Sequence, residues 1–135
     1  MDGKEDLIDA YAYQSEIWSK AYQIMGWLLD KKRVSKEVNR WNMSDIYIYG
    51  GGYLGIQLYQ AIMPYVNVLS VVDKSGKLKI EIDKLPVMDM KSFRDRYKDE
   101  LVIVTPIQYY KEIYCDLREF VSKDNIAFLG DWGIV

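Results

Sequence analysis

The sequence predicts an α/β fold, with a parallel sheet of about five strands, helices on both faces of the sheet, and a helical extension at the N-terminus. Short apolar runs alternate with segments of helical periodicity, an order typical of parallel strands joined by right-handed crossovers. A glycine cluster separates the first of these runs from the helical segment after it. The 135 residues suit one domain. We therefore expect a helical extension over 1–43 and one α/β domain over 44–135.

The extension carries apolar residues at helical spacing. They predict a long helix over 7–29, whose apolar residues occupy more than one face. Such a helix contacts more than one surface, which could belong to its own domain, to a partner domain or to a second copy of the chain. A second, short helix is predicted over 34–41.

The α/β part alternates regularly. Apolar runs predict five strands, over 46–49, 66–72, 85–87, 101–104 and 126–129. Residues at three and four spacing predict helices over 53–63, 89–97 and 107–121. The polar segment 74–84 predicts turns, with an irregular edge hairpin as an option, and Pro86 confines its strand to an edge or a strand start.

The composition excludes several classes of function. Eighteen basic against twenty acidic residues give a net charge of −2, which makes nucleic acid an unfavoured partner. No His is present, so a His-dependent triad and a His zinc site are excluded, and we assign no catalytic or metal-binding residue. Cys115 is expected to be a small buried helix residue. The single Cys, the acidic N-terminus and the lack of a long apolar run predict a cytoplasmic protein without a membrane span.

Three glycines carry most of the functional information. Gly50, Gly52 and Gly55 form a G-x-G-x-x-G pattern between a predicted strand and a predicted helix, the context of the dinucleotide-binding fingerprint of Rossmann-like domains. Gly50 would allow the tight turn, Gly52 the close approach of a pyrophosphate, and Gly55 the packing of helix on sheet. The anion would lie at the helix N-terminus. A tight turn without any ligand is the alternative interpretation of the same glycines.

Other candidates lie where predicted strands end. Asp73 follows the second strand, 18 residues after Gly55, where a carboxylate accepts hydrogen bonds from a ribose and favours NAD over NADP; a solvated turn carboxylate is the alternative. Thr105 and Pro106 follow the fourth strand, and their alternative is a helix N-cap with proline at the first helical position. Tyr53 could cover a nucleotide or pack on the first helix. The candidate site comprises Gly50, Gly51, Gly52, Tyr53, Leu54, Gly55, Asp73, Thr105 and Pro106, with Gly130, Asp131 and Trp132 as weaker candidates.

The stretches 45–55, 66–73, 85–87 and 101–106 together resemble small Rossmann-like domains of bacterial capsule and surface-polysaccharide biosynthesis proteins. These look like parts of nucleotide-sugar dehydratase and epimerase relatives and of sugar acyltransferases. The resemblance covers about residues 34–130. It implies that Gly50, Gly52, Gly55 and Asp73 bind NAD or a nucleotide-sugar.

The chain departs from the catalytic members of that group. Short-chain epimerases and dehydratases use a Tyr-x-x-x-Lys pair, and none of the twelve tyrosines has Lys four positions on. Tyr114 has Arg118 four positions on, and an arginine does not readily release a proton. The sequence therefore predicts a small-molecule nucleotide-binding module that is not catalytic on its own. The alternatives are an interaction module that keeps the fold without a ligand, and the cofactor-binding fragment of a methyltransferase or oxidoreductase.

Overall fold

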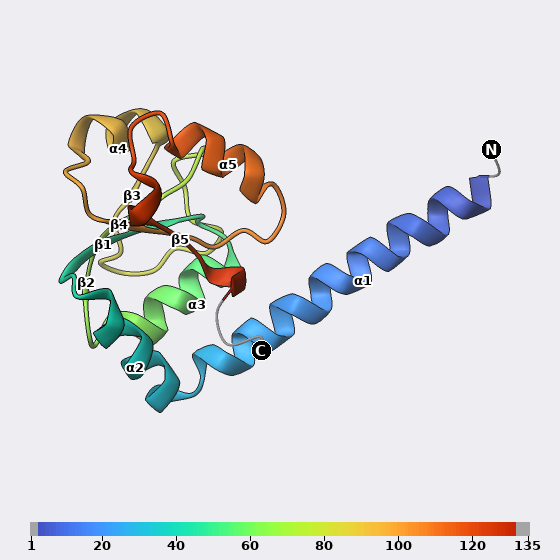
Figure 1. Ribbon diagram of the computed structural model, residues 1–135, viewed down its shortest axis with the longest axis horizontal. Coiled ribbons are helices and arrows are strands. Elements are labelled where there is room, and N and C mark those ends of the chain that lie inside the picture. Colours follow the sequence, from blue (N-terminus) through green and yellow to red (C-terminus); the bar gives the residue numbers. More distant parts are fainter. Residues whose placement is uncertain (1–2, 132–135) are drawn as a thin grey trace.

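The computed structural model describes residues 3–131, with side chains from residue 12 onward, and confirms the α/β class (Figure 1). All strand pairs are parallel, and the five-stranded sheet has the order β3-β2-β1-β4-β5. Its strands are β1 (Asp45–Tyr49), β2 (Asn67–Val72), β3 (Val87–Met88), β4 (Leu101–Val104) and β5 (Ile126–Phe128). The strand order is that of the Rossmann-like folds, which bind ligands where the order reverses, here between β1 and β4.

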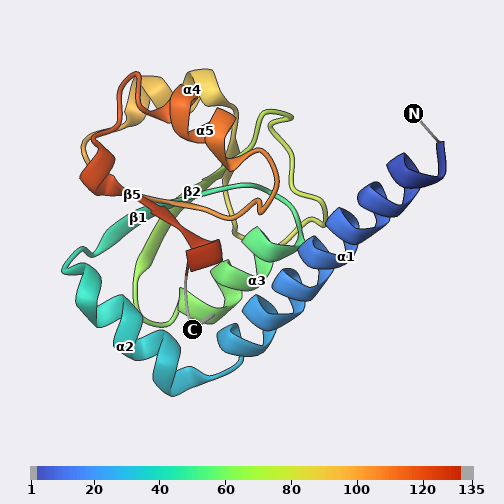
Figure 2. The same cartoon turned by 45° about the vertical axis from the view of Figure 1, so that its right-hand side comes forward.

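Helices cover both faces of the sheet, as the sequence predicts (Figure 2). The helices are α1 (Gly3–Leu28), α2 (Lys31–Trp41), α3 (Tyr53–Ile62), α4 (Met90–Arg96) and α5 (Tyr110–Leu117), with 3-10 turns at Lys123–Asn125 and Leu129–Asp131. Along β1, Ile46 and Ile48 belong to the core shared with α1, α2 and α3. Tyr47 and Tyr49 belong to the core shared with α4 and α5. This alternation is the period of two that a strand imposes on its side chains.

The N-terminal helices contribute to the same core as the sheet. Ile24, Trp27 and Leu28 at the end of α1 are buried in one cluster with the strand residues, as are Val34 and Val38 of α2. The earlier turns of α1 project away from the sheet (Figure 1). No helix among the described residues is long and apolar enough to cross a membrane.

The second helix begins three residues before its predicted start, because Asp30 caps it. The Asp30 Oδ1 atom accepts hydrogen bonds from the backbone N–H groups of Lys32 (3.1 Å) and Arg33 (3.2 Å). Those N–H groups have no acceptor within the helix, so the cap fixes its first residue at Lys31. The apolar pattern, which starts at Val34, does not record this polar first turn.

Three further predicted elements differ from the structure. The helix predicted over 107–121 spans only Tyr110–Leu117. It starts late because Tyr109 adopts a left-handed conformation (φ 63°) that an α-helix cannot contain. After Leu117 the chain continues in turns, with the Glu119 N–H donating to the Asp116 carbonyl (3.4 Å) and the Phe120 N–H to the Leu117 carbonyl (3.1 Å). No hairpin forms over 74–84. That segment instead turns back toward the glycines, with the Lys79 N–H donating to the Gly51 carbonyl (2.7 Å). The edge strand is shifted to 87–88, where Pro86 needs only to accept a hydrogen bond, from Val71 N–H (3.0 Å).

Candidate functional site

Gly50 makes the tight turn that leaves β1. Its φ of +114° is a conformation that residues with a side chain rarely adopt. A Cβ at this position would also collide with the Thr105 hydroxyl and lie 2.9 Å from Cδ of Pro106. The Gly50 N–H donates to the Val72 carbonyl (2.8 Å), which keeps the turn in register with β2. The fold itself therefore requires glycine at position 50.

Gly55 brings the first turn of α3 against that loop. A Cβ here would overlap the carbonyl oxygen of Gly50 and lie 3.3 Å from Thr105 Oγ1. This is the close helix-to-strand packing expected of the third glycine in the G-x-G-x-x-G pattern. Glycine at position 55 is also a requirement of the fold.

Gly52 differs from both. Its backbone is extended (φ −81°, ψ −169°), a conformation open to any residue, and no heavy atom beyond its chain neighbours lies within 4 Å of the position that its Cβ would take. It is the N-cap of α3 and has no side chain that could accept from the first N–H groups of the helix. The fold does not require glycine at position 52, and the space beside it opens onto the start of α3.

Asp73 holds the glycine loop and the segment after β2 together. Its Oδ2 accepts a hydrogen bond from Gly51 N–H (2.8 Å), and its Oδ1 accepts from the backbone N–H (2.9 Å) and the hydroxyl (2.7 Å) of Ser75. Partial burial acts to raise the pKa of the carboxyl, but the hydrogen bonds from Ser75 and Gly51 outweigh it and lower the pKa. A carboxylate offers about four lone-pair sites, so Oδ2 keeps capacity for one further donor.

Replacing Asp73 with Asn tests the contribution of these hydrogen bonds to stability. Because the folded-state pKa is depressed, the stabilisation is complete above the unfolded-state value of about 3.9 and is lost as the pH falls through the folded-state pKa. At pH 7 we expect Asp73→Asn to lower the free energy of unfolding by about 1 kcal/mol, a value reduced for partial exposure. Urea unfolding at pH 7 and pH 3 measures the difference between variant and wild type. A difference in the free energy of unfolding that is equally large at both pH values would contradict a stabilising role of the ionised Asp73 carboxylate.

Thr105 connects β4 to the end of β1. Its hydroxyl (2.9 Å) and its N–H (3.0 Å) both donate to the Tyr49 carbonyl, and the residue is buried. The alternative interpretation of Thr105 as a helix N-cap is wrong, since α5 begins at Tyr110 after the left-handed Tyr109. Thr105 and Pro106 instead lie against Gly50, at the carboxyl edge of the sheet.

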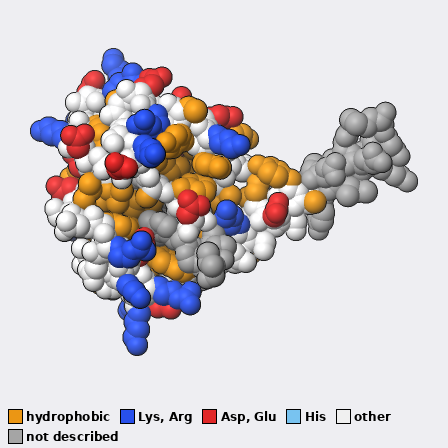
Figure 3. All heavy atoms as spheres, viewed as in Figure 1, with side chains coloured by type: hydrophobic (Ala, Val, Ile, Leu, Met, Phe, Trp, Pro, Cys, Tyr) orange, Lys and Arg blue, Asp and Glu red, His pale blue; other side chains and the backbone are white. Residues whose placement is uncertain are grey.

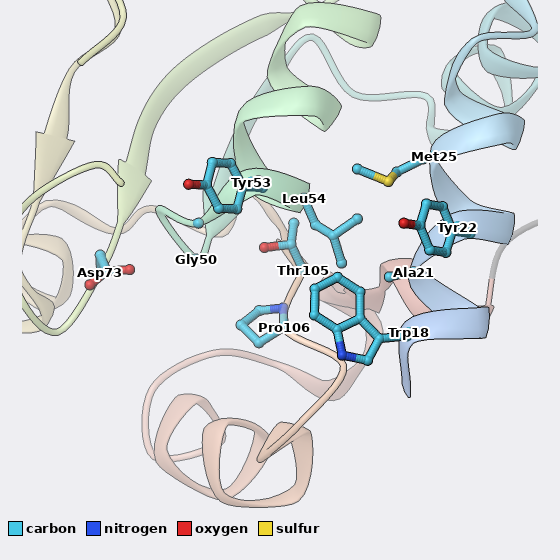
Figure 4. Close-up of a pocket in the computed structure, with 12 residues that line it drawn as sticks. Trp18, Ala21, Tyr22, Met25, Gly50, Tyr53, Leu54, Asp73, Thr105 and Pro106 are labelled. Atoms are coloured by element: carbon cyan, nitrogen blue, oxygen red, sulfur yellow. The ribbon is translucent and has the colours of Figure 1, made fainter. Parts of the chain in front are cut away.

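A cavity of about 380 Å³ joins these residues to α1 (Figure 4). It lies at the switch point between β1 and β4, where open α/β folds bind ligands. Apolar and aromatic side chains dominate its walls, as in small-molecule sites. The lining residues are Trp18, Ala21, Tyr22, Met25, Gly50, Gly52, Tyr53, Leu54, Gly55, Asp73, Thr105 and Pro106. The structure thus brings eight of the nine candidate site residues to one cavity.

The ninth candidate, Gly51, does not line this cavity. It lines a second hollow of about 320 Å³ together with Gly52, Asp73, Ser75, Lys77, Leu78 and Lys79. Gly52 and Asp73 border both spaces. The second hollow, unlike the first, has two lysines in its lining.

The sequence alone did not identify the wall that α1 contributes. Trp18, Ala21, Tyr22 and Met25 line the cavity, whereas their spacing indicated only an apolar helix face. Figure 3 shows hydrophobic side chains along the described part of α1. Trp18 and Tyr22 are 59% and 67% exposed. Two large aromatic residues four positions apart on a helix could have signalled a site, but a buried helix shows the same spacing.

The other residues singled out in the sequence are Tyr53, Cys115, Gly130, Asp131 and Trp132. Tyr53 is exposed at the rim of the cavity. Cys115 is exposed, so the expectation of a buried thiol is wrong: it falls on the outer side of α5, while Ile113 and Leu117 face the core. Gly130 and Asp131 form a 3-10 turn outside the lining of the cavity, and Trp132 lies outside the described residues. Within the described residues no group of three or more Cys, Asp or Glu side chains is placed so that it could hold a metal ion.

Comparisons with protein-family models, with curated proteins and with solved structures found no match to this chain.

Proposed function

We propose that the chain is a nucleotide-binding module whose glycine loop, Gly50 to Gly55, receives the phosphates of NAD or of a nucleotide-sugar. The module holds its ligand without catalysing a reaction on its own. The resemblance of the loop and of the strand ending at Asp73 to surface-polysaccharide biosynthesis proteins favours a role in sugar metabolism. Asp73, with its one free acceptor position, favours a ribose hydroxyl over a 2′-phosphate.

One observation carries the proposal: neither its backbone conformation nor its packing requires glycine at position 52. Gly50 and Gly55 are explained by φ and by packing, whereas a Cβ at position 52 would meet no atom within 4 Å other than those of its chain neighbours. The space lies at the N-terminus of α3, where backbone N–H groups and the helix dipole attract an anion. A phosphate approaching these N–H groups would need the room that a side chain at position 52 would fill.

Two hollows that the glycine loop borders support a ligand with two halves. Gly52 and Asp73 border both the apolar cavity and the hollow that contains Lys77 and Lys79. A dinucleotide or a nucleotide-sugar has its phosphates in the middle and a larger group at each end. With the phosphates at Gly52, each end would have a hollow beside it.

A thermal-shift panel of NAD, NADP, UDP-sugars and CMP-sugars tests the proposal. A ligand at about 100 times its Kd adds roughly 2.7 kcal/mol to the free energy of unfolding, so at least one of these compounds should raise the Tm by several degrees. In Gly52→Val this shift should vanish, while the ligand-free variant stays folded, with a loss of about 1 kcal/mol for the poorer N-cap.

Gly26→Val is the matched control for this substitution. Gly26 also has open space at its Cβ position, but it lies in α1 and does not line the cavity. The Gly26→Val variant should keep the full ligand-induced rise in Tm. If none of the compounds raises the Tm of the wild-type protein, the nucleotide proposal fails.

A further inference from the structure

The cavity has an aromatic wall on the side of α1. The rings of Trp18 and Tyr22 have centroids 6.4 Å apart and planes tilted by 36°. Their high exposure means that the domain itself covers little of either ring. In Figure 4 the Trp18 indole lies beside Leu54, Thr105 and Pro106, and Tyr22 and Met25 continue the wall along α1. Two broad ring surfaces therefore border a space whose opposite side is the glycine loop.

Few polar groups face this space. None of the described residues that line it is Asn, Gln, Lys or Arg. The Thr105 hydroxyl already donates to the Tyr49 carbonyl, and the Asp73 carboxylate, which accepts three hydrogen bonds, has room for one further donor. A hexose moved into the cavity would exchange the water around its several hydroxyl groups for mostly apolar walls, and the free acceptor position of Asp73 and the hydroxyl groups of Tyr22 and Tyr53 would offset only part of that cost. A flat ring suits the same walls, because aromatic side chains stack on the face of any base.

The size of the cavity limits what it encloses. Its volume of about 380 Å³ is near the lower end of the roughly 300–1,000 Å³ that small-molecule sites span. It accommodates one ring system with its ribose more readily than a whole dinucleotide. The phosphate attached to that ribose would then lie beside Gly52, at the start of α3.

We infer that α1 supplies the base-binding wall of the nucleotide site, with the planar ring of the ligand held between Trp18 and Tyr22 on one side and the glycine loop on the other. The inference rests on the proposed function. Beyond the proposed function, this inference names the part of the ligand that lies in the cavity, the base, and the helix that covers the base, α1. A nucleotide-sugar would therefore place its base, and not its hexose, in this cavity.

Calorimetric titration with AMP, UMP and ribose 5-phosphate tests the inference. Ribose 5-phosphate keeps the sugar and the phosphate but lacks the base, so AMP or UMP should bind the wild-type protein at least about 10-fold more tightly, the order expected for one stacked base. Trp18→Ala should remove most of that preference, and Trp18→Phe, which keeps a ring, should retain part of it. Tyr13→Ala is the control, since Tyr13 is a 57% exposed aromatic residue of α1 that does not line the cavity.

The indole N–H resonance of Trp18 in an NMR spectrum gives a second readout. AMP should shift this resonance, identified by its absence in Trp18→Ala, and leave those of the buried Trp27 and the partly buried Trp41 nearly unchanged. Trp18 is exposed, so the ligand-free Tm of its variants should stay close to the wild-type value.

The outcomes separate the two proposals. If AMP binds and Gly52→Val abolishes binding, but Trp18→Ala keeps the full preference over ribose 5-phosphate, the base-binding wall is refuted and the nucleotide site stands. If neither the mononucleotides nor ribose 5-phosphate binds, both proposals fall. Tighter binding of geranyl phosphate than of AMP would show that the cavity takes an aliphatic chain, which also overturns the inference.

Discussion

Gly55→Ala is expected to destabilise the protein by about 2 kcal/mol or more, although alanine is the better helix former. The added Cβ would overlap the carbonyl oxygen of Gly50, a backbone atom fixed by the turn at φ +114° and by the hydrogen bond from Gly50 N–H to Val72. Overpacking of this kind costs about 1–3 kcal/mol or more, since no flexible side chain can move aside. The gain in helix propensity, up to about 1 kcal/mol, offsets only part of that cost.

Gly52→Ala is the matched control, because it adds the same methyl group in the same loop. Its Cβ would meet no heavy atom within 4 Å, so the free energy of unfolding should change by less than about 1 kcal/mol. Urea unfolding followed by circular dichroism measures both variants. Equal stability of the two would contradict the close packing of α3 against the turn.

The sheet could be predicted from the sequence because its residues carry the pattern themselves. The runs at 46–49 and 101–104 are buried on both faces, and in a parallel sheet such strands are continuously apolar. The glycine loop was equally visible, since its spacing and its place between strand and helix are both local features. Such predictions depend on neighbours in the sequence and need no knowledge of tertiary contacts.

The parts that could not be predicted depend on contacts between distant segments. Asp73 was visible as an acidic residue at the end of a strand, but its hydrogen bond to Gly51 N–H joins residues 22 positions apart. The left-handed conformation of Tyr109 leaves no mark in an apolar pattern, so α5 was predicted too long. The position of Trp18 and Tyr22 beside the glycine loop follows from the packing of α1 against α3, and their spacing is the same in a core helix.

Gly52→Asp is expected to weaken nucleotide binding strongly without lowering the stability of the protein. An Asp at the N-cap can accept from the N–H groups in the first turn of α3, as Asp30 does in α2 and Asp89 does with Ser92 in α4. This cap should leave the free energy of unfolding unchanged or raise it by a few tenths of a kcal/mol relative to glycine. The same carboxylate would occupy the proposed phosphate position and repel the ligand. Two charges about 4 Å apart interact by roughly 1 kcal/mol in bulk water and roughly 4 kcal/mol near a protein surface, so we expect nucleotide affinity to fall at least about 100-fold.

Gly52→Asn isolates the charge from the shape. Asn caps a helix about as well as Asp and has nearly the same size, so both variants fill the space beside Gly52 equally. The ligand for this comparison is the nucleotide that gives the largest Tm shift in the thermal panel. Its affinity should be at least about 10-fold higher for the Asn variant than for the Asp variant. This difference in affinity should become smaller as salt is added. Calorimetry at low and high ionic strength measures this. Equal affinities at low salt would mean that no phosphate lies at the start of α3, and that the glycine at position 52 serves some purpose other than admitting an anion.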